Sequence, residues 1–491
     1  METLKTFDIE DNVLIGTKTW NPHIINCINI GDLILKSFKS NPDFIGQVDA
    51  ETGEENTFQQ MKEKSVKCAL WMQKSGIQIN DVIMVCSHNQ LDAYVPFLAA
   101  LYIGVVVNLL DECLFEEYFL EQIKPKILFI DEKFSVTATV YTNILRILDI
   151  PEPTIIIFGT NEQSITLESI LNDHYNPVSI DNFTCAKVIS MKSTAMKLFT
   201  SGTTAPPKAI EIPYSAFMAP SDQHAPNMLQ NDIALSFESL GFINGIFMTI
   251  QAIFLHVKMI KVKSQFHTER TCKIIEQYKV TWAFLETSMC VQLIKSIDLG
   301  KHDLSSLKNV VFSGSTVNSY EIHIVLRAWL PNASILQAYS LTETGIIAYQ
   351  RQSGKPGSSG YVSQNVCLKI ISLNPLNREK SLGLNMQGEI CCTSPYMMIH
   401  KDDESAAHDN QFNSNWFRTG DMGYYDKDGD IFIIDRINQL FEYQNHQISP
   451  TSIETILQNH LAVSEAVVTS IPDNNVMHPL AFVTKIPGIE V

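Results

Sequence analysis

The stretch "DVIMVCSHNQLDAYVPFLAALYIGVVVNLL", from Asp81 to Leu110, carries the pattern that decides the fold. A short apolar strand pattern, "DVIMVCS", is followed by an apolar helix pattern that begins near Tyr94 and by a second apolar strand pattern that ends at Leu110. The next pattern, "PKILFID", is again a short apolar strand. Short, fully apolar strands that alternate with helices are typical of parallel sheets covered on both faces, so the stretch predicts an α/β fold.

The same alternation continues through most of the chain. The amphipathic stretch "TFQQMKEKSVKCALWMQKSG" precedes Asp81, "TCKIIEQYK" leads later into "VTWAFLE", and "LKNVVFSGS" follows another helix pattern. From about Val362 to Ile434 the pattern changes to short strands with turns between them, such as "VCLKIISL", "GEICCTS" and "DIFIIDR". We therefore expect a β-rich subdomain here, with "DKDGD" as a turn. After Arg436, "PTSIETILQNHL" predicts a helix, and "VSEAVVTSIPD" and "LAFVTK" predict strands of a second, small α/β unit.

Length and composition limit the functional classes. The chain has 491 residues, and at roughly 150 residues per domain this suggests about three packing units. Hydrophobic residues make up 45% and charged residues 18% of the chain, which is typical of a globular protein. The formal net charge of −17 argues against nucleic-acid binding, which needs a basic patch. The ten cysteines show no CxxC pair, so we interpret them as reduced core residues in a reducing compartment.

No segment predicts a membrane span or a secretory signal. The apolar run from Tyr94 to Leu110 is interrupted by Pro96, Gly104 and Asn108, and a span needs about 20 apolar residues. The N-terminus is polar and of mixed charge, unlike a signal peptide. The C-terminal "IEV" is not a peroxisomal address.

The stretch "LFTSGTTAPPKAIEI", from Leu198 to Ile212, resembles a phosphate-binding loop. Small residues can present backbone N–H groups to a phosphate, hydroxyls add donors, and a lysine adds charge. The residues that offer these groups are Thr200, Ser201, Gly202, Thr203, Thr204 and Lys208. A Walker-type loop is excluded, because Pro207 replaces its second glycine and Ala209 follows the lysine. Taken alone, the stretch favours an ordinary Ser/Thr turn before a strand.

Two downstream stretches favour a nucleotide site. In "QAYSLTETG", Tyr339 offers an aromatic face for a base, Thr342 a hydroxyl for a phosphate, and Glu343 a carboxylate for Mg²⁺. In "WFRTGDMGYYDKDGDIFIIDR", Asp421 follows a glycine, where its carboxylate could accept from both ribose hydroxyls. Each stretch alone is weak evidence for a nucleotide site, but the three stretches in this order and at these separations are a specific signal.

The three stretches together resemble the adenylate-forming (AMP-binding) superfamily, in particular its acyl-CoA synthetases, 4-coumarate–CoA ligases and insect luciferase-like proteins. The resemblance runs from about Asp43 to Lys485 and includes the segment "DRINQLFEYQNHQISPTSIETIL". It implies a large N-terminal domain, 1–435, of two doubly wound sheets and a β-barrel subdomain at about 362–434. It also implies a small mobile α/β cap at 436–491, truncated here.

The resemblance implies an acid–thiol ligase. Such enzymes use ATP and Mg²⁺ to activate a carboxylic acid, here a fatty acid, to an acyl-adenylate, and they pass the acyl group to coenzyme A. Family members imply a peroxisomal or cytoplasmic location.

The resemblance also assigns roles to residues of this chain. Thr200 to Lys208 would bind the triphosphate, Tyr339 would stack on adenine, and Ser313 to Thr316, with Gly314 and Ser315, would line the adenine and acyl sites. Lys208, Thr342 and Glu343 would be the catalytic residues, with Thr342 at the α-phosphate and Glu343 on Mg²⁺. Asp421 and Arg436 would bind ribose, and Asp435 would be the hinge of the cap.

The sequence departs from the family pattern at four places. Together these departures affect both steps of the reaction, formation of the acyl-adenylate and transfer to coenzyme A. Ala205 and Ala209 replace loop glycines, and alanine is costly there only if the backbone needs φ > 0 or close phosphate approach. Phe242 replaces a histidine beside the acyl pocket and would reshape or block that pocket, or else be a core phenylalanine. The segment from Asn438 to Asn445 lacks the lysines of the thioester-forming motif. The chain ends at Val491, before the position of the family's adenylation lysine.

Two hypotheses follow. The first is the acid–thiol ligase, favoured by motif order and coverage. The second is a pseudoenzyme that binds a nucleotide or an acyl ligand without turnover, favoured by the departures. No residue of this sequence separately supports a luciferase-like oxygenase.

Overall fold

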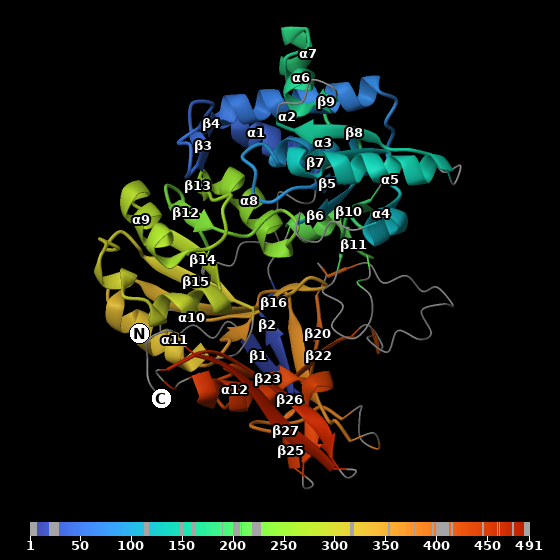
Figure 1. The fold of residues 1–491 in the computed structure, drawn as a ribbon. Coiled ribbons are helices and arrows are strands. Elements are labelled where there is room, and N and C mark those ends of the chain that lie inside the picture. Colours follow the sequence, from blue (N-terminus) through green and yellow to red (C-terminus); the bar gives the residue numbers. More distant parts are fainter. Residues whose placement is uncertain are drawn as a thin grey trace.

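The computed structural model in Figure 1 shows three sheets with helices packed around the upper two and a small C-terminal part below them. It describes residues 7–18, 29–111, 117–147, 151–159, 164–188, 190–199, 207, 209–218, 227–314, 319–351, 354–374, 376, 380–394, 397–398, 412–413, 416–443, 446–458, 460, 462–473 and 476–485.

The first sheet confirms the parallel α/β prediction made from the stretch Asp81 to Leu110. Its order is β11 (Ala209–Pro213), β10 (Thr194–Phe199), β6 (Val106–Leu110), β5 (Val82–Cys86), β7 (Ile127–Asp131), β8 (Thr154–Phe158) and β9 (Ile165–Thr166). All pairs are parallel except the hairpin of β10 and β11. Every residue of β6 and β7 is buried, as expected for strands with helices on both faces.

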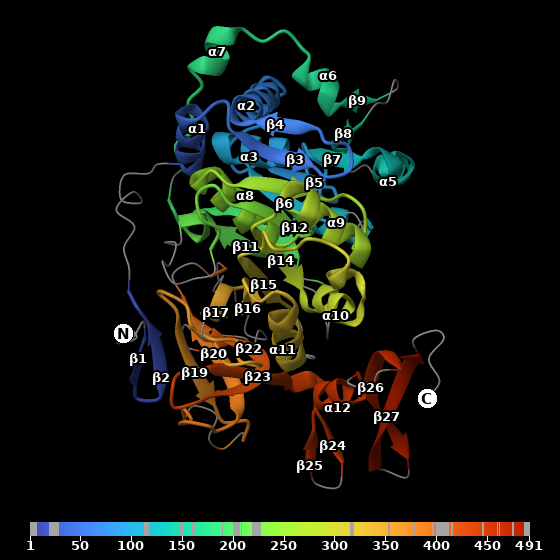
Figure 2. The same cartoon turned by 90° about the vertical axis from the view of Figure 1, so that its left-hand side faces the viewer.

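Helices cover both faces of this sheet. One core contains α1 (Ile30–Ser40), α2 (Phe58–Lys74) and α3 (Tyr94–Ile103), and the core on the opposite face contains α4 (Glu117–Ile123) and α5 (Ser135–Ile147). Two short helices, α6 (Leu167–Leu171) and α7 (Pro177–Asp181), lie beyond α2 (Figure 2). Local sequence explains where α2 begins: the side chains and backbones of Thr57 and Gln60 form a capping box.

The second sheet has a parallel centre and antiparallel edges. Its order is β18 (Tyr361–Val362), β17 (Gly345–Tyr349), β16 (Ser334–Leu341), β15 (Asn309–Ser313), β14 (Trp282–Glu286), β12 (Ile233–Ser236), β13 (Lys258–Lys261), β3 (Ile45–Asp49) and β4 (Glu55–Thr57). One face is covered by α9 (Thr268–Tyr278), α10 (Thr287–Lys295) and α11 (Ser319–Trp329). The other face is covered by α8 (Ile243–Leu255), which also joins the core of the first sheet and so lies between the two.

The third sheet is the β-rich region, and it is antiparallel. Its order is β1 (Phe7–Glu10), β2 (Val13–Gly16), β19 (Cys367–Ile371), β20 (Gly388–Thr393), β22 (Trp416–Tyr425) and β21 (Phe412–Asn413), with β23 (Ile431–Arg436) also paired to β22. The N-terminal hairpin of β1 and β2 belongs to this sheet, although the sequence analysis assigned no structure to it. Its turn, Asp11 and Asn12, has φ of 50° and 62°, the left-handed values that two-residue hairpin turns use.

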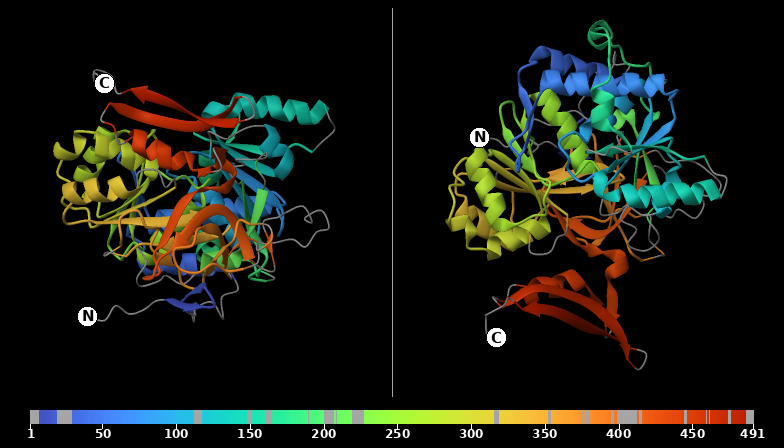
Figure 3. Two further views of the ribbon diagram at one scale, coloured as in Figure 1. Left: turned by 90° about the horizontal axis from the view of Figure 1, so that it is seen from below. Right: turned by 45° about the horizontal axis from the view of Figure 1, so that its top comes forward.

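The C-terminal part contains the predicted helix and both predicted strands. It comprises β24 (Phe441–Tyr443), β25 (His446–Ile448), α12 (Pro450–Gln458), β26 (Val463–Asp473) and β27 (Val476–Lys485), and Figure 3 shows it beside the rest of the chain. Asp435 Oδ2 accepts from the Ser449 hydroxyl at 2.6 Å and from the Thr451 N–H at 3.1 Å, so the predicted hinge residue caps α12. Lys295 Nζ donates to the Val463 carbonyl at 3.0 Å and links this part to α10.

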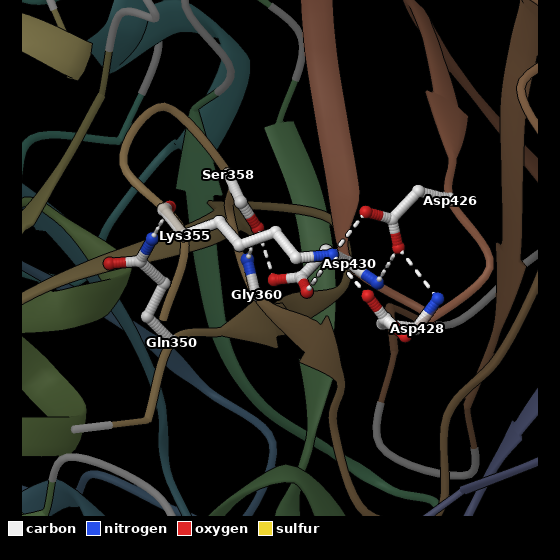
Figure 4. Close-up of polar contacts among 7 residues, drawn as sticks. All are labelled: Gln350, Lys355, Ser358, Gly360, Asp426, Asp428 and Asp430. Atoms are coloured by element: carbon white, nitrogen blue, oxygen red, sulfur yellow. Dashed lines mark hydrogen bonds and ion pairs between the residues drawn. The ribbon is translucent and has the colours of Figure 1, made fainter. Parts of the chain in front are cut away.

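A lysine joins the second and third sheets. Figure 4 shows the Lys355 side chain reaching three carboxylates of the turn between β22 and β23. Its Nζ contacts Asp426, lies 2.8 Å from Asp428 Oδ2 and lies 3.2 Å from Asp430 Oδ2. Burial disfavours the ammonium, but the three carboxylates outweigh it and raise the pKa of Lys355. Asp430, which is fully buried, also accepts from the Ser358 hydroxyl at 2.8 Å.

Two further expectations concern cysteines and membranes. Of the eight cysteines in the described ranges, six are buried as predicted, while Cys185 and Cys367 are only half-buried, and Cys185 still packs against the core of the first sheet. Cys27 and Cys113 lie outside the described residues. No helix in the described part of the chain is long and apolar enough to cross a bilayer.

Candidate active site

The carboxyl end of β16 carries the first predicted site residues. β16 ends at Leu341 and pairs back onto β17, with Leu341 opposite Gly345. Gly345 has a φ of 70°, a conformation that glycine adopts without strain, so it permits the tight return. The turn places Thr342 and Glu343 three and four residues after the buried Tyr339.

A continuous set of polar contacts joins Tyr339 to the third sheet. Asp421 on β22 lies opposite Arg436 at the end of β23. The Tyr339 hydroxyl donates to Asp421 Oδ2, and Arg436 Nε lies 2.9 Å from Asp421 Oδ1. Arg436 Nη1 also donates to the Thr419 carbonyl at 3.0 Å, and the Asp421 N–H donates to the Thr419 hydroxyl at 3.0 Å. The structure thus brings together three residues that the sequence placed in two separate stretches.

Burial sets the electrostatics of this group. Asp421 is 4% exposed, and burial raises its pKa even though Arg436 favours the charged form. Burial also raises the pKa of Tyr339 well above its usual value, and the Asp421 charge adds to this effect. The tyrosine is therefore a neutral donor to the carboxylate at physiological pH. Because Tyr339 is only 8% exposed, its ring has little free face as it stands.

Glu343 differs from Asp421 because no other residue within the described ranges pairs with its carboxylate, which has only a hydrogen bond to its own backbone. The Glu343 carbonyl accepts a hydrogen bond from the Met398 N–H at 2.8 Å. In the part of the chain that the structure describes, this is the only hydrogen bond between Glu343 and another residue. The side chain is half-buried, and this burial raises the pKa of Glu343, while Arg436 opposes the shift. A poorly solvated carboxylate that no other residue pairs with is suited to accept a cation.

The end of β15 lies beside this turn. The Ser313 hydroxyl is 3.4 Å from that of Ser340, and the Ser340 hydroxyl is 3.5 Å from Asn244 Oδ1 on α8. The Thr287 hydroxyl donates to the Ser313 carbonyl at 3.2 Å, and Gly314 follows with a φ of 116°. The predicted residues Ser315 and Thr316 lie outside the described residues.

Only the ends of the predicted phosphate loop are described. Thr200, Ser201, Gly202, Thr203, Thr204, Ala205 and Lys208 lie outside the described residues. Phe199 and Ala209 are cross-strand partners, and the Tyr118 hydroxyl donates to the Pro207 carbonyl at 2.8 Å. Ala209 belongs to β11 and is absent from the residues with positive φ, so alanine causes no backbone strain at this position.

The structure also places the other two departures. Phe242 is the N-cap residue of α8 and is 41% exposed, so it is not a core phenylalanine. In the lysine-free segment, Glu442 lies exposed on β24, and Asn445 lies outside the described residues.

Sequence reasoning missed Thr419, Tyr118 and Ser340, which support the site through their hydroxyls. Thr419 lies two residues before Asp421 in "RTGD", and Ser340 lies beside Tyr339 in "QAYSLTETG", so these two were within the quoted motifs. No sequence pattern pointed to Tyr118 as a site residue, because its contact with Pro207 joins positions 89 residues apart.

The fold defines one class of protein, whose members are named AMP-binding enzymes. Residues 36–399 match the model of the AMP-binding enzyme family. Because the match covers most of the chain, the chain belongs to the AMP-binding enzyme family.

Similar proteins include both luciferases and ligases. A luciferin 4-monooxygenase from Nipponoluciola cruciata is 26% identical over 494 residues, covering 96% of this chain and 87% of that protein. The 4-coumarate–CoA ligase CCL1 from Humulus lupulus is 24% identical over 506 residues, covering 100% of this chain and 91% of that protein. The structure of the luciferase-like enzyme from the nonluminescent mealworm Zophobas morio superimposes with a TM-score of 0.76 at 27% identity, covering 87% of this chain and 99% of that one. The fold class implied by the resemblance is confirmed.

Proposed function

We propose that this chain activates a carboxylic acid, with fatty acids as the first class to test, by joining it to the AMP part of ATP with release of pyrophosphate. The observation that carries the proposal is the Glu343 carboxylate, which no other described residue pairs with, beside the connected group of Tyr339, Asp421 and Arg436. Family membership and the similarity to a protein named as a coenzyme A ligase support the same reaction class.

Each residue of the connected group has a place in nucleotide binding. The Asp421 carboxylate keeps lone pairs beyond those used by Tyr339 and Arg436, so it can still accept from ribose hydroxyls. Arg436 fixes the orientation of that carboxylate and keeps positive charge close to it. Tyr339 would face the adenine, which requires a small movement that exposes one ring face.

Glu343 fits the magnesium ion that the family implies. Mg²⁺ prefers oxygen ligands and commonly takes one or two carboxylates together with substrate phosphates. When bound, the ion would neutralise phosphate oxygens. Thr342, next to it, would donate its hydroxyl to the α-phosphate, and Lys208 would place its charge on the triphosphate with the hydroxyls of the loop.

We further propose that the chain divides at Asp435 into a nucleotide-binding part, 1–435, and a cap, 436–491. The support is the position of Asp435, which lies one residue before the end of β23 and caps α12 through Ser449 and Thr451. Rotation about this residue would break both hydrogen bonds.

Transfer of the acyl group to coenzyme A is the second step of the proposed reaction. A pseudoenzyme is the alternative, favoured by the lysine-free strand β24, whose one exposed residue is Glu442. A segment without lysines offers no cation to the phosphates of coenzyme A.

Single-turnover formation of acyl-AMP from Mg-ATP and a panel of medium- and long-chain fatty acids tests the proposal. We expect product with the natural chain and a large loss with Lys208→Ala, because the loop loses its only cation for the triphosphate. Product that is equal in both proteins would contradict the assignment of the loop. ATP binding without any product would favour the pseudoenzyme.

Asp421→Asn is expected to weaken ATP binding by about 10- to 100-fold, the equivalent of one charge-assisted hydrogen bond of roughly 1.5–3 kcal/mol. Calorimetric titration with ATP measures the change, and Asp173→Asn, at an exposed position, is the matched control. Unchanged affinity in a folded Asp421→Asn protein would remove Asp421 from the nucleotide site.

A further inference from the structure

The two parallel sheets meet at their carboxyl ends. Asn89, just after β5, donates through Nδ2 to the Val262 carbonyl at 3.1 Å, and its Oδ1 accepts from Lys261 Nζ at 3.2 Å. A Cβ on Gly241 would lie 2.3 Å from the Asp111 nitrogen, so the loop after β12 packs directly on the end of β6. The ends of strands in such sheets are where α/β proteins bind ligands.

Glu238 lies in this loop, two residues beyond β12, and is only 9% exposed. Its N–H donates to the Ser236 hydroxyl at 3.1 Å. Its carboxylate has neither a hydrogen bond nor an ion pair within the part of the chain that the structure describes. Buried charged groups in proteins are normally paired, because an unpaired one costs much free energy. Fold stability therefore gives no reason for a carboxylate at this position.

The surroundings of Glu238 are acidic. Burial, followed by the charges of Glu286 and Asp111, raises the pKa of Glu238 to about 8. Asp111 is buried and already pairs with His88 Nδ1 at 2.9 Å. Lys261 is also buried, but its hydrogen bond goes to Asn89. Among the described residues, His88 and Lys261 are thus directed to other groups, and the Glu238 carboxyl is left without a partner there.

The loop that carries Glu238 leads to the candidate active site. It continues into α8, where Asn244 Oδ1 lies 3.5 Å from the Ser340 hydroxyl, two residues before Thr342. Strands β12, β14, β15 and β16 are neighbours in this order. Three strand spacings of about 4.8 Å separate β12 from β16, or roughly 14 Å along the sheet edge. A small-molecule acid with its carboxyl group near Thr342 could reach Glu238 with its far end.

The chemistry of the site favours an organic cation over a metal. No group of three or more His, Cys, Asp or Glu side chains among the described residues has the arrangement to hold a metal ion. An alkylammonium group needs only one carboxylate within hydrogen-bond distance and brings three donors of its own. Binding would replace the carboxyl proton with the ammonium charge and so supply the missing partner.

We propose that Glu238 binds the ammonium group of a small amine, most simply an amino group at the far end of the acid that is activated. The proposal rests on the proposed function for the position of the acid, but recognition of the ammonium does not depend on turnover. A separate alkylamine that accepts the acyl group would offer the same chemistry.

Calorimetric titrations test the proposal without ATP. The probes are ω-aminoalkanoates of six to twelve carbons (on the order of the strand spacings above), alkanoates of the same lengths, and the corresponding alkylamines. We expect one aminoalkanoate to bind at least about tenfold more tightly than its alkanoate, a gain of about 1.4 kcal/mol. The preference should vanish in Glu238→Gln and persist in Glu10→Gln, at an exposed position on β1.

Two further readouts separate recognition from a structural role. Ammonium binding at pH 7 should release a proton, measured as a dependence of the binding enthalpy on the buffer. Glu238→Gln should melt no lower than the natural chain, because it removes an unpaired buried acid. A preference for alkylamines over aminoalkanoates would assign the ammonium to a separate amine. No preference for any ammonium probe, or a preference unchanged in Glu238→Gln, would overturn the proposal, whether or not acyl-AMP is formed.

Discussion

Glu343→Gln is expected to slow formation of acyl-AMP by about 10²–10³-fold, the usual effect of removing one group that stabilises charge at a reacting centre. The amide has nearly the same shape but loses the negative charge that would hold Mg²⁺ against the phosphate oxygens. Rapid-quench measurement of acyl-AMP at a series of Mg²⁺ concentrations gives both the rate and the metal requirement. We expect the variant to need more Mg²⁺ and to remain slower at saturation.

Stability distinguishes a ligand-binding role of Glu343 from a structural one. Its pKa is raised by burial, so the folded state favours the protonated form. At a pH below the ordinary pKa of a carboxyl group, ionisation of Glu343 costs the folded state nothing. As the pH rises above that pKa, the cost to the free energy of unfolding grows. Glu343→Gln should therefore melt higher than the natural chain at pH 7 and equally at pH 4. A rate equal to that of the natural chain, with normal dependence on Mg²⁺, would exclude Glu343 as the metal ligand.

The sequence predicted the parallel sheets because their strands are apolar on both faces. The pattern of "PKILFID" required burial on both sides, and β7 is buried throughout. The N-terminal hairpin escaped prediction for the opposite reason: three of the four residues of β1 are exposed, so the strand has little apolar pattern. The hairpin joins the sheet through β2, which pairs with β19 across most of the length of the chain, and local patterns do not encode such a pairing.

The site was predictable as a set of residue types but not as a geometry. Motif order pointed to Tyr339, Asp421 and Arg436, yet nothing in the sequence indicated that the tyrosine donates to the aspartate. Glu238 gave no signal at all, because a single glutamate before an apolar helix is common on protein surfaces. Only the packing of its loop on the end of β6 makes it a buried acid.

Lys355→Met is expected to destabilise the fold by roughly 2–4 kcal/mol, somewhat below the cost of breaking a fully buried pair, because the lysine is partly exposed. The change leaves Asp430, whose side chain is 1% exposed, without its cation and detaches the turn after β17 from the turn between β22 and β23. Denaturant unfolding followed by fluorescence measures the free energy of unfolding. Lys279→Met, which breaks an exposed pair with Asp303, is the matched control and should cost little.

A second substitution and the pH dependence show whether the carboxylates are the cause. Asp430→Asn in the Lys355→Met background should restore part of the loss, because it removes the buried charge that the lysine had neutralised. The pKa of Lys355 is raised in the folded state. The lysine therefore contributes fully to the free energy of unfolding at a pH below the ordinary lysine pKa, and this contribution is lost as the pH rises through the raised pKa. Lys355 lowers the pKa of Asp428. The contribution of Asp428 to the free energy of unfolding is therefore present at a pH above the ordinary aspartate pKa and is lost on acidification through the lowered pKa. If the double variant is no more stable than Lys355→Met, the lysine acts through packing of its alkyl chain and not through the three carboxylates.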